Sequence, residues 1–169
     1  MNYPRPQMKR PAWQSLDGEW TVNGQAGKDP ACRSEEKLIY EKAFSYRRLN
    51  DRVLLHFGAA DQIAEVWLNG CYLGRHVGGY LPFSFDVTDS IRENNRLRVE
   101  VTDTLDHTYP YGKQRKDRGG MWYTPVSGLW KSVWLESVPE TYISRVEITP
   151  DRKGVTLAVT TRSPDGTKT

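Results

Sequence analysis

The chain predicts an all-β fold. Aromatic residues make up 11% of its 169 residues, and they lie among β-branched residues rather than at the spacing of a helix face. Asn69-Gly70 stands between two apolar runs, where this dipeptide readily takes the positive φ values of a type I′ turn and joins residues 64–68 to 71–77 as a hairpin. Short apolar segments separated by turn residues recur along the chain, which is typical of a β-sandwich or β-barrel.

Alternation of apolar and polar residues predicts the other strands. Residues 96–101 place apolar side chains on one face and charged side chains on the other, as in a half-buried strand. Residues 80–88 are expected to point four apolar side chains inward, namely Leu81, Phe83, Phe85 and Val87. Further strands are predicted at residues 18–22, 39–49, 52–58, 129–138, 142–150 and 154–163.

Composition excludes several classes of partner. The formal net charge is only +3, so no large field attracts nucleic acid or anionic lipid. No apolar run approaches the ~20 residues of a membrane span, and we expect no membrane association. The first residues lack the secretory pattern of charge, apolar segment and cleavage site, so we expect a cytoplasmic protein or one already trimmed. Cys32 and Cys71 lie far apart in the sequence and are expected to be reduced thiols.

The pattern of the sequence changes near Pro139. Residues 1–139 hold most of the predicted strands, whereas residues 140–169 hold one strand pair and a polar end. Two strands alone are marginally stable in water. We therefore expect residues 140–169 to open a second β-domain whose remainder is missing, and to lean on the first domain or stay mobile.

No catalytic motif is visible in the sequence. The three histidines are isolated, and the chain has no nucleophile elbow, no phosphate-binding loop and no cluster of metal ligands, so we expect no metal and no cofactor. Asp103 and Asp106 lie close together at a predicted strand end. They are read either as an acid pair or as turn-forming residues, and the spacing favours the turn.

A long segment between Thr102 and Gly128 has the chemistry of a sugar-binding site. Flat aromatic rings cover the apolar face of a pyranose, while amide, carboxylate and cationic groups meet its hydroxyls. The segment offers both, and its glycines allow close approach of the backbone. The candidate sugar-binding or pocket-shaping residues are Trp122, Tyr123, Lys113, Gln114, Tyr111 and Asp106. In the alternative reading, Trp122 and Tyr123 only close the edge of the sandwich.

His76 lies in the run GRHVGGY. An isolated histidine of this kind either donates to a ligand hydroxyl or bonds neighbouring backbone to fix a tight turn. The adjacent Gly78 and Gly79 favour the structural role.

Several motifs occur in an order that resembles one enzyme family. They are LDGEW, VLLHFGAADQIAEVWLNG, GRHVGGYLPFSFDVTD, YGKQ and WYTPVSGLWKSVWLESVP. From about Leu16 to Pro139 the chain resembles the N-terminal sugar-binding domain of glycoside hydrolase family two, the β-galactosidase, β-glucuronidase and β-mannosidase group. The resemblance implies a galactose-binding-like jelly-roll sandwich, followed by an immunoglobulin-like domain and a barrel that carries two catalytic glutamates.

The resemblance also assigns roles to individual positions. It implies a structural role for the hairpin and for the HxGGYxPF segment, here Asn69, Gly70, His76, Gly78, Gly79 and Tyr80. Several members send a loop acid toward the substrate pocket of the barrel, and Trp122 stands at that place here. Any contribution to a sugar subsite is therefore expected to come from stacking, with Lys113 and Gln114 as polar companions. The segment of residues 23–50 is shorter than the corresponding segment in most members of the family.

Three functions remain open from the sequence. The leading hypothesis is a non-catalytic accessory domain of a family-two glycosidase, with a β-glycoside, the immunoglobulin-like domain and the barrel as partners. The second is a free-standing carbohydrate-binding module. The third is a structural docking domain without affinity for sugar.

Overall fold

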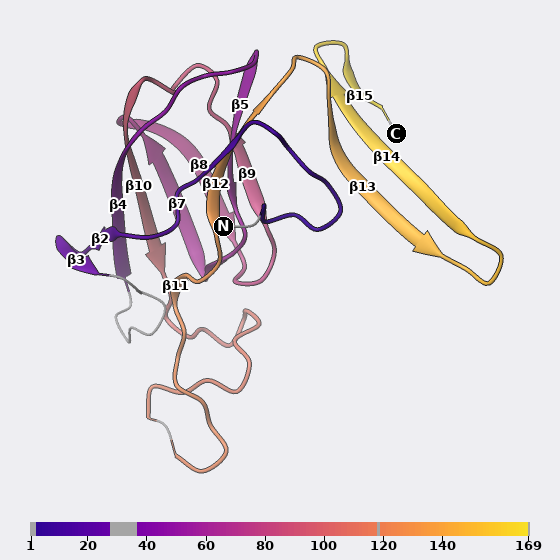
Figure 1. Ribbon diagram of the computed structural model, residues 1–169. Helices are drawn as coiled ribbons and strands as arrows, with labels where there is room; N and C mark the ends of the chain where they lie inside the picture. The colour runs from indigo at the N-terminus through magenta and orange to yellow at the C-terminus, as the bar shows by residue number, and fades with distance from the viewer. Residues whose placement is uncertain (1–2, 28–36, 118, 169) are drawn as a thin grey trace.

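The computed structural model describes residues 3–27, 37–117 and 119–168, and the described residues form strands, turns and loops only (Figure 1). None of them forms a helix of the length and apolarity that crossing a membrane requires. The smaller main sheet is antiparallel with the strand order β1-β12-β5-β9. Its strands are β1 (Trp13–Ser15), β12 (Val133–Val138), β5 (Arg52–Phe57) and β9 (Phe83–Asp86).

The larger main sheet has the strand order β3-β2-β4-β10-β7-β8. Its strands are β3 (Gln25–Gly27), β2 (Trp20–Val22), β4 (Lys37–Ser45), β10 (Asn94–Thr102), β7 (Ile63–Leu68) and β8 (Cys71–Val77). At one rim, β6 (Ala60–Asp61) pairs with β11 (Gly128–Leu129). A separate sheet contains β13 (Tyr142–Pro150), β14 (Val155–Ser163) and β15 (Gly166–Lys168).

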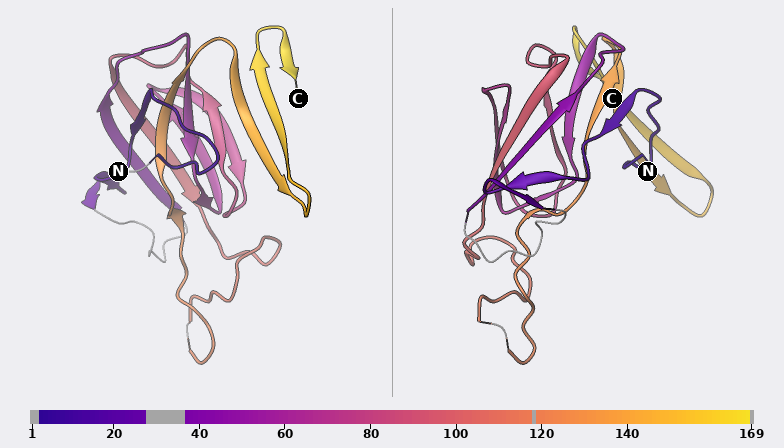
Figure 2. Two further views of the ribbon diagram at one scale, coloured as in Figure 1. Left: turned by 45° about the vertical axis from the view of Figure 1, so that its right-hand side comes forward. Right: turned by 60° about the vertical axis from the view of Figure 1, so that its left-hand side comes forward.

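The two main sheets enclose one apolar core between them (Figure 2). Leu55 and Phe57 of the smaller sheet are fully buried, as are Leu97 and Val99 of the larger sheet. Phe57 stacks on Phe83 with ring centroids 4.7 Å apart. Burying side chains of this size contributes about 2 kcal/mol each, so the interlayer packing is the main stabilising term of the fold. The predicted all-β sandwich is confirmed.

The predicted hairpin and the half-buried strand are confirmed as well. Asn69 and Gly70 have φ values of 54° and 83°, and they join β7 to β8. In β10, Leu97, Val99 and Val101 are buried, whereas the charged residues between them are exposed or half-buried.

The inward position predicted for Leu81 is wrong. Its side chain is 71% exposed, and β9 begins only at Phe83. Gly78 has a φ of 116° and turns the chain away from β8 before Pro82 leads into β9, so the alternation does not extend to Leu81.

The single strand predicted at residues 129–138 is divided into β11 and β12. β11 pairs with β6 at the rim, whereas β12 pairs with β5 in the smaller main sheet. Two different partners need two different directions, so residues 130–132 make a bend between the strands. Cys71 is a free and exposed cysteine, while Cys32 lies outside the described residues.

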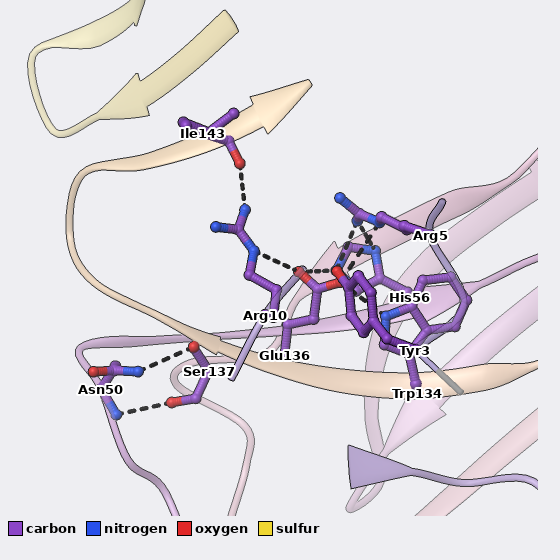
Figure 3. A network of polar contacts seen from close by, with 9 residues as sticks. All are labelled: Tyr3, Arg5, Arg10, Asn50, His56, Trp134, Glu136, Ser137 and Ile143. Atoms are coloured by element: carbon purple, nitrogen blue, oxygen red, sulfur yellow. Dashed lines mark hydrogen bonds and ion pairs between the residues drawn. The ribbon is translucent and has the colours of Figure 1, made fainter. Parts of the chain in front are cut away.

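A buried carboxylate holds the N-terminal segment on the outer face of the smaller sheet (Figure 3). Glu136 is fully buried, and its Oε1 accepts hydrogen bonds from Tyr3 Oη at 2.5 Å and Trp134 Nε1 at 2.9 Å. Arg10 Nε donates to Oε2 at 3.2 Å. Burial by itself raises the pKa of this carboxyl, but hydrogen bonds from His56, Trp134 and Tyr3 hold the pKa well below its usual range.

Gly128 provides a test of the close packing between the rim and the core. Its φ is 92°, and a Cβ at this position would overlap Tyr40 Oη. We expect Gly128→Ala to lower the free energy of unfolding by roughly 3 kcal/mol, because backbone strain and overpacking add. Gly18 has a similar φ of 97° with no atom near its Cβ position, so Gly18→Ala should cost only about 1 kcal/mol. If urea unfolding gave equal losses of unfolding free energy for the two variants, close packing around Gly128 would not be the cause.

The Glu136 network predicts a pH-dependent stability. We expect Glu136→Gln to lower the free energy of unfolding at pH 7 by roughly 3 kcal/mol, because the charge paired with Arg10 is lost. Folding lowers the carboxyl pKa, so its stabilisation is present above the unfolded pKa of about 4.3 and is lost as pH falls. The difference in the free energy of unfolding between the wild type and Glu136→Gln, measured by urea unfolding, should therefore shrink toward pH 3. Glu93→Gln, at an exposed position, should change little at any pH.

Candidate functional site

Residues 103–127 form an arm that projects from one end of the sandwich, with residue 118 outside the description (Figure 1). The arm leaves the sandwich after β10 and returns to it at β11. Its two ends are joined because Ser127 Oγ donates a hydrogen bond of 2.5 Å to Asp103 Oδ2, and both residues are buried.

Both aspartates at the start of the arm form turns. Asp103 Oδ1 accepts from the backbone N–H of Leu105, and Asp106 Oδ1 accepts from that of Thr108, each at 2.9 Å. The backbone bond from Thr108 lowers the pKa of Asp106. The turn-forming interpretation of these residues is confirmed.

A second buried acid lies at the base of the arm. Asp61 in β6 is 6% exposed, and burial together with the negative charge of Asp103 raises its pKa to about 6. The neighbouring Gln62 donates from Nε2 to the carbonyl of Pro110 at 3.4 Å. The arm is therefore attached to the rim through Gln62, which directly follows β6.

Backbone pairing organises the tip of the arm. Tyr123 N donates to Lys113 O at 2.7 Å, and Arg115 N donates to Tyr123 O at 3.1 Å. The Gln114 side chain closes the same unit, because its Nε2 donates to Tyr111 O at 2.7 Å and its Oε1 accepts from Val126 N at 2.5 Å. The structure thus brings together Lys113, Gln114, Trp122 and Tyr123, and Tyr111 joins them through its carbonyl. Asp106 lies nearer the base of the arm.

The aromatic rings of the arm differ in how free they are. Tyr123 is 66% exposed. Trp122 is half-buried, and the Arg115 guanidinium lies 4.5 Å from its ring centroid. Tyr111 stacks on His107 with ring centroids 4.7 Å apart. Tyr123 consequently offers the freest face for stacking, while Trp122 offers a ring already supported by a cation.

The predicted polar companions have different roles. Lys113 is exposed. Gln114 uses both ends of its amide on the backbone of the arm, so it shapes the arm instead of offering free donors. The interpretation in which the aromatic residues merely close the sandwich edge does not fit Tyr123, whose ring lies on the projecting arm.

The HxGGYxPF segment connects the sandwich to the arm. His76 bonds the carbonyl of Gly78 at 3.1 Å and stacks on Phe83, as expected for a turn-fixing histidine. The Gly79 carbonyl accepts from Trp130 Nε1 at 2.8 Å. The hydroxyl of Tyr80 lies beside Gly112 of the arm.

The sequence pattern did not single out two residues that the structure places at this site. Met121 is 64% exposed at the tip, and Asp61 lies buried at the base. Met121 adjoins Trp122 in the sequence, so proximity was an available signal. For Asp61 no local signal exists, because its burial depends on distant segments. No group of three or more histidine, cysteine or acidic side chains among the described residues is arranged to hold a metal ion.

Comparison with known proteins identifies the family. A model of the glycosyl hydrolase 2 galactose-binding domain-like family matches residues 24–132. The chain belongs to this family. The resemblance expected from the motifs is therefore confirmed, and the family agrees with the observed β-sandwich.

Individual relatives agree with the family match. A β-galactosidase of Thermoanaerobacter pseudethanolicus is 31% identical over 118 residues, which cover 67% of this chain and 15% of the relative. A putative β-glucuronidase of Formosa agariphila is 28% identical over 143 residues, which cover 81% of this chain and 16% of the relative. A solved β-glucuronidase of an uncultured Clostridium species superposes with a TM-score of 0.71 at 27% identity, covering 96% of this chain and 36% of that chain. The chain thus spans less than a fifth of these curated relatives.

The buried acid at the base of the arm makes a testable prediction. Because folding raises the pKa of Asp61 to about 6, the ionised form destabilises the fold above pH 6, and stability rises as pH falls from 6 toward the unfolded pKa of about 3.9. We expect Asp61→Asn to be more stable than the wild type by roughly 1–2 kcal/mol at pH 8, with the difference disappearing near pH 4. Thermal unfolding across this pH range measures it, and Asp89→Asn, at an exposed position, serves as the control. A variant that is less stable at pH 8 would show that the charge of Asp61 is favourable.

Proposed function

We propose that this chain is the non-catalytic N-terminal domain of a longer glycoside hydrolase acting on β-glycosides, and that its arm helps to form the sugar pocket. The observation that carries the proposal is the projecting arm, which holds an exposed Tyr123 on a hydrogen-bonded tip. An arm attached at its base and organised at its tip is suited to present an aromatic ring to a neighbouring domain.

The arm combines the two kinds of group that sugar recognition uses. The Tyr123 ring can cover the apolar face of a pyranose, and the exposed Lys113 ammonium has three donors for its hydroxyls. Trp122, with Arg115 on its ring, provides a second flat surface. The relatives are β-galactosidases and β-glucuronidases by name, which supports a β-glycoside as the substrate class of the complete protein.

Residues 140–169 support the presence of a further domain. The register pairs Val146 with Val159 and Ile148 with Leu157, so these apolar side chains share one face of the separate sheet. Ile148 and Leu157 are 52% and 59% exposed. An apolar face of this kind is stable when a further layer covers it. We infer that it belongs to the immunoglobulin-like domain and that additional strands of that domain cover it.

The complete protein provides the decisive test. We expect Tyr123→Ala in the complete protein to raise KM for a nitrophenyl β-glycoside about tenfold, because a lost stacking contact costs about 1.4 kcal/mol. Tyr72→Ala is the matched control, since Tyr72 is 51% exposed on β8, away from the arm. Equal KM values for both variants would contradict a role for the arm.

The isolated chain separates the alternative functions. Residues 1–169 alone should hydrolyse no nitrophenyl β-glycoside, and turnover abolished by changing Asp103 or Asp106 would overturn the non-catalytic assignment. Tight calorimetric binding of a β-glycan by the isolated chain, lost in Trp122→Ala, would favour a free-standing binding module instead.

A further inference from the structure

A charged groove lies between the smaller main sheet and the β13–β14 pair. Its volume is about 510 Å³, within the range of pockets that hold small ligands. Four arginines from three separate segments line it, whereas Asp86 is its one acidic lining residue. The four are Arg5, Arg10, Arg145 and Arg162. We call this feature the arginine groove.

Two of the arginines form a fixed floor. The side chains of Arg5 and Arg10 are only 22% and 14% exposed. Both contact the carboxylate of Glu136 (Figure 3). Arg5 Nη2 also lies 2.8 Å from His56 Nδ1, and Arg10 donates to the carbonyl of Ile143. One carboxylate thus serves two guanidiniums, each of which has five N–H donors in a rigid plane. Donors therefore remain for a ligand on cations that are already held in place.

The other two arginines lie at the rim of the groove. Tyr142 pairs with Arg162, and Arg145 pairs with Thr160, so these side chains share one face of the β13–β14 pair. Tyr142 fixes the direction of that face, because it packs against Leu54 and Val138 of the first domain. The basic face of the pair is thereby turned toward the sandwich.

The acids near the rim do not neutralise it. Asp86 lines the groove, but its carboxylate is paired at 2.5 Å with Arg52, which is not a lining residue. Arg145 pairs with Glu147, but their side chains are 70% and 51% exposed, and such pairs contribute little and exchange readily. Arg162 has no ion-pair partner within the described parts of the chain.

The four arginines of the groove repel one another, and Glu136 offsets part of this repulsion at Arg5 and Arg10. Guanidinium groups stay charged at any ordinary pH, so gathering them raises their mutual repulsion. His56 also lines the groove. Burial lowers its pKa, the hydrogen bond and charge of Glu136 raise it, and the charges of Arg5 and Arg10 lower it. An anion in the groove would relieve the repulsion.

We propose that the arginine groove binds the carboxylate groups of an acidic saccharide, such as an oligomer of uronic acid. Carboxylates match the planar fork of guanidinium through two parallel hydrogen bonds. Hydroxyl groups of Ser84 and Ser144 in the lining suit the hydroxyls of a sugar. The choice of a saccharide rests on the proposed function, whereas the requirement for an anion rests on the arginines alone.

Calorimetry with the chain of residues 1–169 tests the proposal. The probe is a hexamer of galacturonic acid, and cellohexaose serves as the neutral probe of equal length. We expect the acidic hexamer to bind and cellohexaose not to bind. Arg145→Ala/Arg162→Ala should weaken binding of the acidic hexamer at least about tenfold. Both positions are exposed on strands, so these substitutions should leave the fold intact.

A matched control separates a site from general attraction. Arg75→Ala/Arg96→Ala removes the same charge from the larger main sheet, where both residues are exposed, and should leave the affinity within about twofold. Equal losses in the two double variants would overturn the site. Inorganic sulfate that binds as tightly as the hexamer would overturn the saccharide as its ligand.

An NMR titration of His56 gives a second readout. The hexamer should raise the pKa of His56 in the wild type, because it offsets the charges of Arg5 and Arg10, and should have a smaller effect in Arg145→Ala/Arg162→Ala. An unchanged His56 titration with bound hexamer would place the ligand elsewhere.

The proposed function and the groove fail in different experiments. If the proposed function is wrong, the complete protein will be inactive toward β-glycosides, or its KM will be unaffected by Tyr123→Ala. Neither result alters the binding of the hexamer measured at the groove.

Discussion

Burial of the apolar faces of two sheets against each other is the constraint on which the molecule depends. Leu55 and Phe57 on one side and Leu97 and Val99 on the other are fully buried in the same cluster. Once these layers are closed, the strand ends are confined to the rims, and the chain between β10 and β11 has to leave the sandwich. The arm exists because its two ends are fixed by this packing and by the Asp103–Ser127 hydrogen bond.

The outer face of the smaller sheet is used in a different way. A sheet with water on one side normally carries scattered polar residues there, but this face buries Glu136 beneath the N-terminal segment. The same carboxylate orders Arg10, which bonds the carbonyl of Ile143 in β13. One buried charge therefore links the smaller main sheet, the N-terminal segment and the start of the β13–β14–β15 sheet. It also sets the floor of the arginine groove.

The arm and the arginine groove have contrasting chemistry. The arm presents aromatic rings on a tip organised by backbone pairing, which suits the apolar face of a neutral sugar. The arginine groove presents cations held by a buried acid, which suits a carboxylate. The two proposed contacts with saccharides thus differ in chemistry and in place, one on a loop and one at a junction between sheets.

The sequence by itself determined the elements whose signals are local. The Asn69-Gly70 hairpin, the alternation in β10 and the turns at Asp103 and Asp106 follow from backbone preferences and from a period of two residues. The composition of the arm and the resemblance to the family predicted that its residues belong to one site. Four very short strands gave too little alternation to detect, and these are β1, β3, β6 and β15.

Only the tertiary structure decided which side chains remain free and which distant charges meet. The sequence treats Gln114 and Lys113 alike as polar companions, yet folding engages the amide of Gln114 and leaves Lys113 exposed. Leu81 fits the inward pattern but lies outside its strand. The burial of Glu136 and the lining of one groove by both Arg5 and Arg162 depend on packing between segments more than a hundred residues apart. Local preferences carry no information about such contacts, because they arise only when the sheets pack.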